Sequence, residues 1–437
     1  MSEIRRTHRP LVLASVIVAT FMVAIEATIV STAMPQIVGQ LGGLDLYSWV
    51  FSAFLLTQTA TTVVFGKLSD LYGRKPVMLF GIAVFLLGSV LAGLAWSMPS
   101  MIVFRLIQGI GAGSIQPIAV TIVGDLYSAH ERGKIQGFLA SVWAVSAVLG
   151  PLAGGLIIQR LSWSWIFWIN VPIAILATAG FLVFLHENVA TRRRTIDAIG
   201  AVLFTLAVAA LMIALTEFGT SNGTVAWSAL ALAAVSAALF LWQERRAVDP
   251  MVALALWGRR PIAAANGTAL LSGMAVIGLT TFLPMYVQGV LRQSALVAGF
   301  ALTMVTFGWP IGATLAARAF VRYGLRPVLM TGGVLIPLGS TAFVMLHGGS
   351  SPVIAGIGSF VMGFGMGLLS TASLVLIQEI VDWAQRGSAT ASNIFARNLG
   401  STLGATVFGA VLNYGLTHSP GGAVTSDHLR RLLEGDA

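Results

Sequence analysis

A short charged loop separates the second and third long apolar runs of the chain, and it reads GKLSDLYGRK at residues 66–75. The end of this loop returns in the second half, where YGLRPVL at residues 323–329 echoes YGRKPVM at residues 72–78. A second echo follows in the same order: Arg132-Gly133 precedes the fifth apolar run, and Arg386-Gly387 precedes the thirteenth. Weak internal symmetry is the signature of a fold built from two similar halves. We therefore predict two pseudo-symmetric helical bundles.

The composition excludes a soluble globular protein. Of the 437 residues, 57% are hydrophobic and 9% are charged, whereas soluble chains carry about a quarter charged residues. A chain this apolar has more hydrophobic side chain than one core can bury, so its solvent is lipid. The sequence has no cysteine, which excludes disulfides and thiolate metal sites. We expect an all-α integral membrane protein that holds no metal and no cofactor.

Thirteen apolar runs are long enough to cross a membrane. A bilayer core about 30 Å thick needs ~20 apolar residues in each helix. The 262–288 and 352–378 runs exceed this length, which implies tilt or a broken helix. We predict about 13 transmembrane helices, at residues 11–31, 48–66, 77–97, 100–123, 138–158, 165–185, 197–217, 225–243, 262–288, 296–317, 327–346, 352–378 and 391–413.

The internal repeat divides these runs into two halves with an insertion between them. The second half begins with the ninth run, so the seventh and eighth runs are two inserted spans. We expect an N-terminal six-helix bundle at residues 1–190 and two inserted transmembrane helices with their linkers at 191–260. A C-terminal bundle of five helices at 261–413 and a short polar tail at 414–437 complete the chain.

Most basic residues of the connecting loops fall on one side of the membrane. A net charge of +9 would favour nucleic-acid binding in a soluble protein. When the chain is threaded through its spans, however, nearly all loop Lys and Arg share the side of the N-terminus. Only Arg160 and Arg292 lie in loops on the opposite side. Because basic loops stay in the cytoplasm, we expect a multi-pass protein of the cytoplasmic membrane with a cytoplasmic N-terminus, and no nucleic-acid partner.

Two charged residues lie deep in the predicted spans at a similar depth. Glu26 is about 15 residues into the first run, and Arg105 enters the fourth run from the other side. A charge at the bilayer centre costs about 2.5–3.5 kcal/mol, so each needs a partner or a function. Burial disfavours the charged carboxylate and a nearby guanidinium favours it, so Glu26 can be poised to take up and release a proton. A static ion pair, or a carboxylate solvated in a cavity, is the alternative.

Two further features of the spans have both structural and functional interpretations. Arg397 lies about six residues into the thirteenth run, with Asn393 on the same face; it either lines a cavity or extends toward the nearby cytoplasmic surface. Gly150-Pro151 and Gly154-Gly155 in the fifth run permit a bend and the close approach of another helix. Such a helix suits alternating access, but membrane helices also carry glycine and proline for packing alone.

Three motifs in order resemble those of the major facilitator superfamily. Residues 66–75 resemble its signature loop between spans two and three, and residues 105–113 (RLIQGIGAG) are similar to its fourth-span motif. Residues 146–155 (SAVLGPLAGG) resemble the fifth-span antiporter motif, with Ser146 in place of the usual glycine. The likeness runs from about residue 10 to 413. It implies the major facilitator fold.

Further marks resemble the fourteen-span drug:proton antiporters of that superfamily. The first span has IEATIV at residues 25–30, with Glu26 where aspartate is usual, and WSWIFWINVP at 163–172 has Ser164 where arginine is usual. The two inserted spans fit the same group. Its last span is not found after residue 413, so we expect a chain that is natively shortened, truncated, or completed by a partner.

The resemblance assigns roles to particular residues. Arg74 would pair with Asp125, and Asp70 would face the positive N-terminal end of the thirteenth helix near Ser388, which latches the two halves at the cytoplasmic side; in the repeat, Val321 stands where Asp70 would fall. The proposed residue sets are Glu26 and Arg105 for proton coupling, Gly66, Asp70, Gly73, Arg74, Lys75 and Asp125 for the cytoplasmic gate, Gly150, Pro151, Gly154 and Gly155 for the antiporter-motif helix, and Gln58, Gln108, Trp143, Asn266, Tyr286, Gln288, Asn393 and Arg397 for the substrate cavity.

These inferences favour a secondary transporter and not an enzyme. We expect a monomer in the lipid bilayer that exchanges protons for a small hydrophobic or amphiphilic drug, cationic if it pairs with Glu26, by alternating access. Export of a specific metabolite, lipid or peptide is a second interpretation. A non-transporting membrane scaffold, truncated from a transporter, is a third.

Overall fold

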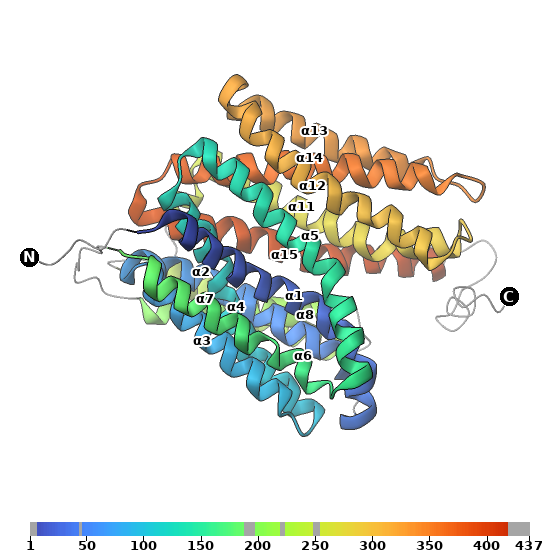
Figure 1. Ribbon diagram of the computed structural model, residues 1–437, viewed down its shortest axis with the longest axis horizontal. Coiled ribbons are helices and arrows are strands. Elements are labelled where there is room, and N and C mark those ends of the chain that lie inside the picture. The colour runs from blue at the N-terminus through green and yellow to red at the C-terminus, as the bar shows by residue number, and fades with distance from the viewer. Residues whose placement is uncertain (1–6, 43–45, 188–196, 219–222, 248–253, 418–437) are drawn as a thin grey trace, which may run out of the picture.

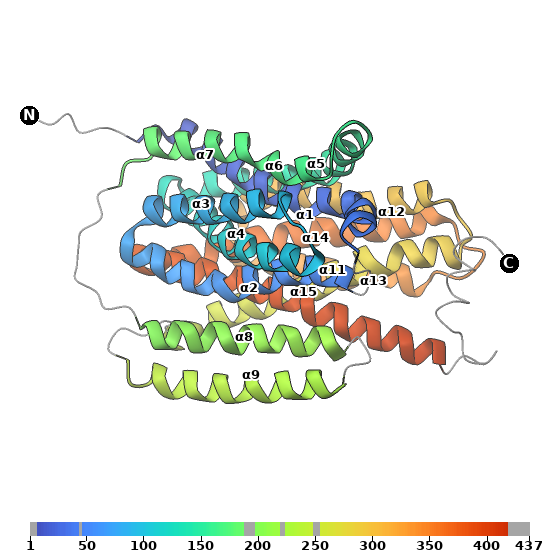
Figure 2. The ribbon, with the colours of Figure 1, turned by 90° about the horizontal axis from the view of Figure 1, so that it is seen from below.

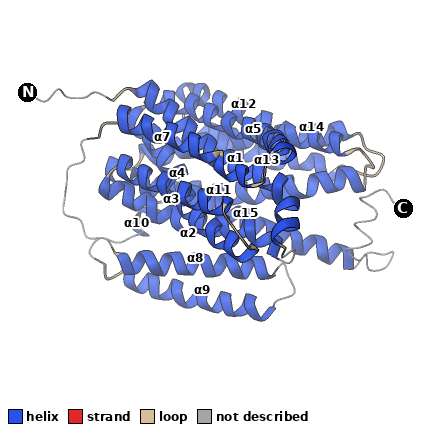
Figure 3. Cartoon of the chain, turned by 60° about the horizontal axis from the view of Figure 1, so that its bottom comes forward, coloured by secondary structure: helices blue, strands red, loops and turns tan. Residues whose placement is uncertain are grey.

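The computed structural model describes residues 7–42, 46–187, 197–218, 223–247 and 254–417. Every regular element in these ranges is a helix, and the long helices run roughly side by side (Figures 1 and 3). Twelve of them are long and apolar enough to cross a membrane, by length and composition. They correspond in order to the first twelve predicted runs. The chain is therefore a multi-pass membrane protein.

The first half is a compact set of helices around α1 and α4. Its elements are α1 (Arg9–Leu41), α2 (Tyr47–Tyr72), α3 (Arg74–Gly93), α4 (Met98–Leu126), α5 (Ala129–Arg160), α6 (Ser164–Trp168) and α7 (Asn170–Phe184). The predicted sixth span is a pair of helices, α6 and α7, that meet at Ile169. Its core joins α1, α3, α4 and α7 through buried side chains such as Val16, Phe85 and Phe181.

The two inserted helices lie together on the outside of the bundle. α8 (Ala198–Phe218) and α9 (Gly223–Glu244) pack on each other below the remaining helices in Figure 2. α8 also packs on α2. The aromatic side chains of Phe204 and Phe240 form a buried cluster with Phe395, which belongs to the second half. The insertion therefore covers the seam between the halves on one face.

The second half repeats the arrangement of the first. Its elements are α10 (Leu254–Trp257), α11 (Arg260–Gly289), α12 (Ala295–Tyr323), α13 (Leu325–Val344), α14 (Pro352–Glu379), the short 3-10 helix η2 (Trp383–Gln385) and α15 (Arg386–Thr417). The repeat is visible at the two loops that first indicated it. Gly73 joins α2 to α3 with φ +95°, and Gly324 joins α12 to α13 with φ +83°. Only glycine adopts such a conformation without strain.

The thirteenth predicted run forms α15 but is not among the twelve apolar helices. Its mean hydropathy is lower because it carries polar residues such as Asn393, Arg397 and Asn398. It nevertheless packs against α11 and α2, between the two halves. Residues 418–437 lie outside the described residues, and so do parts of the predicted linkers at 188–196 and 248–253, so the predicted domain limits and the missing last span stay predictions.

Candidate functional site

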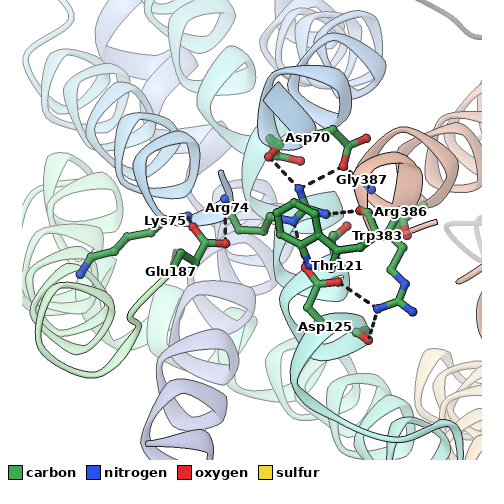
Figure 4. A network of polar contacts seen from close by, with 12 residues as sticks. Asp70, Arg74, Lys75, Thr121, Asp125, Glu187, Trp383, Arg386 and Gly387 are labelled. Atoms are coloured by element: carbon green, nitrogen blue, oxygen red, sulfur yellow. Dashed lines mark hydrogen bonds and ion pairs between the residues drawn. The ribbon is translucent and has the colours of Figure 1, made fainter. Parts of the chain in front are cut away.

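Arg74 joins the two halves of the molecule at one end. It is the first residue of α3 and is fully buried. Its Nε donates to Asp125 Oδ2 of α4 at 2.9 Å, and its Nη1 lies 3.1 Å from Asp70 Oδ1 of α2. Its Nη2 donates to the carbonyl oxygen of Trp383 at 2.8 Å, and the guanidinium lies over that indole at 4.1 Å from the ring centroid (Figure 4). One cation thus holds a loop of the second half against the first.

Asp70 caps the first turn of α15. Its Oδ1 accepts from the backbone N–H of Gly387 at 2.9 Å, and its Oδ2 accepts from Ser388 N at 2.8 Å and Ser388 Oγ at 2.7 Å. Acidic groups are stabilised at helix N-termini by the free N–H groups and the helix dipole. α2 and α15 meet here through Gly66 and Gly387, where a Cβ on either residue would overlap the other's carbonyl oxygen.

Two more ion pairs cross between the halves at the same end. The second oxygen of Asp125 accepts from Arg386 Nη1 at 3.2 Å. Arg132 of α5 pairs with Glu379 of α14 at 2.7 Å. We call the contacts of Asp70, Arg74, Asp125 and Arg386 the latch. It closes the space between the halves at this end.

Lys75 lies beside the latch but does not bridge the halves. Its Nζ donates to the carbonyl oxygens of Leu182 and Leu185, both at 2.8 Å. Glu187 accepts from the backbone N–H groups of Arg74 at 3.0 Å and Lys75 at 2.8 Å, and so caps α3 (Figure 4). These contacts hold the end of α7 on α3 within the first half, and they orient Arg74.

Glu26 and Arg105 form a buried ion pair inside the first half, as their similar depths predicted. Glu26 is fully buried and Arg105 is 2% exposed. The other carboxylate oxygen of Glu26 accepts from Asn170 Nδ2 at 2.7 Å, and Asn170 also donates to Ser89 Oγ at 2.9 Å. The pair is therefore enclosed by side chains of α1, α3, α4 and α7.

Arg105 has contacts on both of its sides. Its Nη1 donates to Gln108 Oε1 at 2.7 Å, and its Nε donates to the carbonyl oxygen of Val50 at 3.2 Å. Its guanidinium lies 4.3 Å from the ring centroid of Phe54. Arg105 and Phe54 also line the cavity described next, whereas Glu26 does not. A change in the charge of the Glu26 carboxylate can thus affect the cavity through Arg105.

A cavity of about 470 Å³ lies between the two halves, on the far side of the latch. Its size is within the range of small-molecule sites. The residues that line it are mostly apolar, with a small number of amide, hydroxyl and guanidinium groups, and they include Val23, Phe51, Phe54, Gln58, Arg105, Gln116, Gln136, Trp143, Val276, Leu279, Val305, Trp309, Leu374, Ile394, Arg397, Asn398 and Ser401.

The comparisons with known proteins identify the family. Residues 16–405 match the profile of the Major Facilitator Superfamily. The chain belongs to this superfamily. Among curated proteins, it is 32% identical over 418 residues to the multidrug transporter protein MdtP of Bacillus subtilis, covering 94% of this chain and 76% of that protein. It is 35% identical over 410 residues to multidrug resistance protein 3 of the same organism, covering 92% and 79%.

Solved structures show the same fold. The human organic anion transporter MFSD10 aligns with a TM-score of 0.68 at 17% identity, over 98% of this chain and 99% of that one. The proton:xylose symporter XylE aligns with a TM-score of 0.53 at 14% identity, over 97% and 93%. The chain thus has the major facilitator fold.

α5, which was predicted to carry the antiporter motif, contacts α1 at two of its glycines. Gly150 packs on Thr28, whose Oγ1 donates to the carbonyl oxygen of Ser146 at 3.0 Å, and Gly154 packs on Ile29 and Thr32. Gly155 has open space beside it and takes no part in this contact. α5 continues as a helix through residue 151; the side chain of Pro151 lies outside the described residues.

Three of the predicted cavity residues line the cavity: Gln58, Trp143 and Arg397. Five do not line it, and the polar group of each forms a hydrogen bond with another residue of its own helix or of a neighbouring segment. These bonds are Gln108 to Arg105, Asn266 to Ser392, Tyr286 to the Leu346 carbonyl oxygen, Gln288 to the Pro284 carbonyl oxygen, and Asn393 to the Ala265 carbonyl oxygen.

Asn170, the second partner of Glu26, was not among the site residues predicted from the sequence. A signal was available, because Asn170 is the one amide side chain in the apolar run at 165–185. Buried polar groups need hydrogen-bond partners, and this asparagine is fully buried. Gln116 and Gln136, which also line the cavity, were not predicted either.

Proposed function

We propose that the chain is a secondary exporter that moves a hydrophobic or amphiphilic compound outward in exchange for protons. The observation that carries this proposal is the relation of Glu26, Arg105 and the cavity. A fully buried carboxylate binds a guanidinium that also reaches the cavity wall. Glu26 can therefore either bind a proton or pair as a carboxylate with Arg105. When Glu26 is protonated, it no longer neutralises the positive charge of Arg105 at the cavity wall.

The two ends of the molecule differ in a way that suits alternating access. The latch closes one end, and we propose that this end faces the cytoplasm, because most loop Lys and Arg lie on the same side. On this proposal, the cavity is reached from outside while the latch is closed. We propose that the bundles predicted at residues 1–190 and 261–413 rock about the cavity, and that breaking the latch opens the cytoplasmic end.

Protonation couples to this motion through charge. A proton that arrives from outside neutralises Glu26 and frees Arg105, so the pair separates more easily. The closed state at the cytoplasmic end then loses one of the attractions that hold α1, α4 and α7 in place. Release of the proton from Glu26 into the cytoplasm restores the ion pair. Each elementary charge that crosses the membrane contributes ~2.3 kcal/mol per 100 mV.

The relatives support transport of small molecules, because two of them carry multidrug names. We place the protein in the cytoplasmic membrane as a monomer with its N-terminus in the cytoplasm. Purified protein in liposomes tests the proposal. A fluorescent amphiphilic dye should accumulate against its gradient when a pH gradient is imposed, and an ionophore that collapses the gradient should abolish accumulation. Equal accumulation with and without the pH gradient would exclude proton exchange.

A further inference from the structure

Arg397 is fixed at the cavity wall by the crossing of α15 and α11. Ile394, Arg397, Asn398 and Ser401 occupy one face of α15 and all line the cavity. The carbonyl oxygen of Arg397 lies so close to Gly273 of α11 that a Cβ there would overlap it. Ser401 Oγ also donates to the carbonyl oxygen of Gly273 at 3.3 Å. The backbone that carries the guanidinium is therefore held tightly against its neighbour.

Arg397 does not reach the cytoplasmic surface. It lies eleven positions after Arg386, the first residue of α15, which places it roughly 16 Å along the helix at 1.5 Å per residue. This is farther than an arginine side chain extends. The alternative that Arg397 reaches the nearby surface, left open by the sequence, does not fit this position.

The guanidinium of Arg397 has no acidic partner among the described residues. Arg74, Arg105, Arg132 and Arg386 each pair with a carboxylate. In the same described part of the chain, no hydrogen bond, ion pair or ring contact involves the Arg397 side chain, and no Asp or Glu lines the cavity. Because Glu26 neutralises Arg105, the described cavity wall carries a net positive charge.

We propose that the cavity binds an amphiphilic anion, a small apolar body that bears one carboxylate or sulfonate group, and that this group pairs with Arg397. A guanidinium that lines a mostly apolar cavity without an acidic partner is poorly compensated, and an anionic ligand compensates it. Guanidinium groups bind carboxylates and sulfonates by two parallel hydrogen bonds. The indoles of Trp143 and Trp309 offer flat apolar surface for the body of the ligand. This inference deepens the proposed function and rests on it.

Matched probes separate charge from hydrophobicity. We would measure binding of naphthalene-1-sulfonate, its neutral carboxamide analogue and 1-naphthylmethylammonium to the full chain in nanodiscs, with tryptophan fluorescence as the readout. The sulfonate should bind about tenfold or more tightly than the ammonium, as expected for a charge-assisted hydrogen bond. Arg397→Gln should reduce that ratio to near one, and Arg397→Lys should keep most of it. Arg318→Gln, which removes an exposed cation outside the cavity, should leave the ratio unchanged.

Equal binding of the three probes to the wild-type protein, or tighter binding of the ammonium, would overturn the inference even if the Arg397 variants fail to fold. So would an unchanged ratio in Arg397→Gln. Nanodiscs with and without phosphatidylglycerol distinguish a soluble ligand from an anionic lipid, since only a lipid that occupies the site would compete with the sulfonate. The binding ratio requires no proton gradient, so its failure is distinct from a failure of proton-coupled transport.

Discussion

Ser388 donates two hydrogen bonds to Asp70, from its backbone N–H at 2.8 Å and from its hydroxyl at 2.7 Å. These bonds join the end of α2 to the first turn of α15, and hence one half of the molecule to the other. Asp70 is 4% exposed, so water does not screen the contact. The stability of the closed end that carries the latch should therefore depend on this carboxylate.

Asp70→Asn should weaken the closed state, because an amide keeps the shape but loses the charge that the helix N-terminus stabilises by about 0.5–2 kcal/mol. The chain has no native cysteine, so spin labels can be placed at Tyr72→Cys and Val321→Cys, which are exposed on opposite halves. The distance distribution between the labels should shift toward longer values in Asp70→Asn. Asp382→Asn is the control, since it removes an exposed carboxylate nearby. A distribution unchanged from wild type would show that Asp70 does not hold the latch.

Gly387→Ala should open the same end by a different route. Its added Cβ would overlap Ser69 Oγ, Asp70 Oδ1 and the carbonyl oxygen of Gly66, so α2 and α15 would have to separate. Gly155→Ala is the matched control, because its Cβ enters open space and an alanine there stabilises the helix by about 0.5–1 kcal/mol. We expect longer label distances and slower transport for Gly387→Ala only. Similar transport rates in the two variants would contradict the close-packing argument.

Gly73→Ala and Gly324→Ala should each destabilise the protein by about 1–3 kcal/mol, because both positions have positive φ angles that alanine rarely adopts. Thermal unfolding in detergent measures the effect. Gly299→Ala, a helical glycine with open space beside it, should not lower the midpoint. If Gly73→Ala and Gly324→Ala unfold at the wild-type midpoint, then the two turns do not require glycine.

Asn170→Ala should lower stability, because it leaves a buried oxygen of Glu26 without its hydrogen bond. Such a loss costs about 1–3 kcal/mol, visible as a lower unfolding midpoint. Asn398→Ala removes a cavity-lining amide whose side chain makes no hydrogen bond among the described residues, and it should change the midpoint little. Equal changes in the unfolding midpoint for the two substitutions would show that the hydrogen bond from Asn170 to Glu26 does not stabilise the protein.

The sequence predicted the helices more completely than it predicted the residues of the candidate site. Apolar runs and the repeated glycine turn predict the helices well, because both depend on local composition. The pairing of Arg74 with Asp125 was also expected, because the resemblance to the superfamily implies it. The structure has further partners for Arg74, among them Trp383 and Glu187, which no local pattern indicated.

The cavity was the hardest part to predict, and helix rotation explains why. Asn393 and Arg397 share a face by spacing, yet Arg397 lines the cavity while Asn393 bonds to the carbonyl oxygen of Ala265. Which side of a helix faces a neighbour and which faces the cavity depends on tertiary packing. Hydrophobic periodicity does not resolve it in a bundle where all faces are apolar. Asn170 was not predicted because its partner Glu26 is far away in the sequence, and only the packing of α7 on α1 brings the two together.

We propose that Glu26 couples protons to transport, and transport driven by a pH gradient in liposomes tests this role. Liposomes that contain wild-type protein, Glu26→Gln or the control Asp382→Asn would be given the same pH gradient, and accumulation of a fluorescent amphiphile would be followed. We predict that Glu26→Gln loses gradient-driven accumulation by about tenfold or more, while it still exchanges labelled for unlabelled substrate, and that the control behaves as wild type. Gradient-driven accumulation by Glu26→Gln at the wild-type level would exclude a coupling role for Glu26.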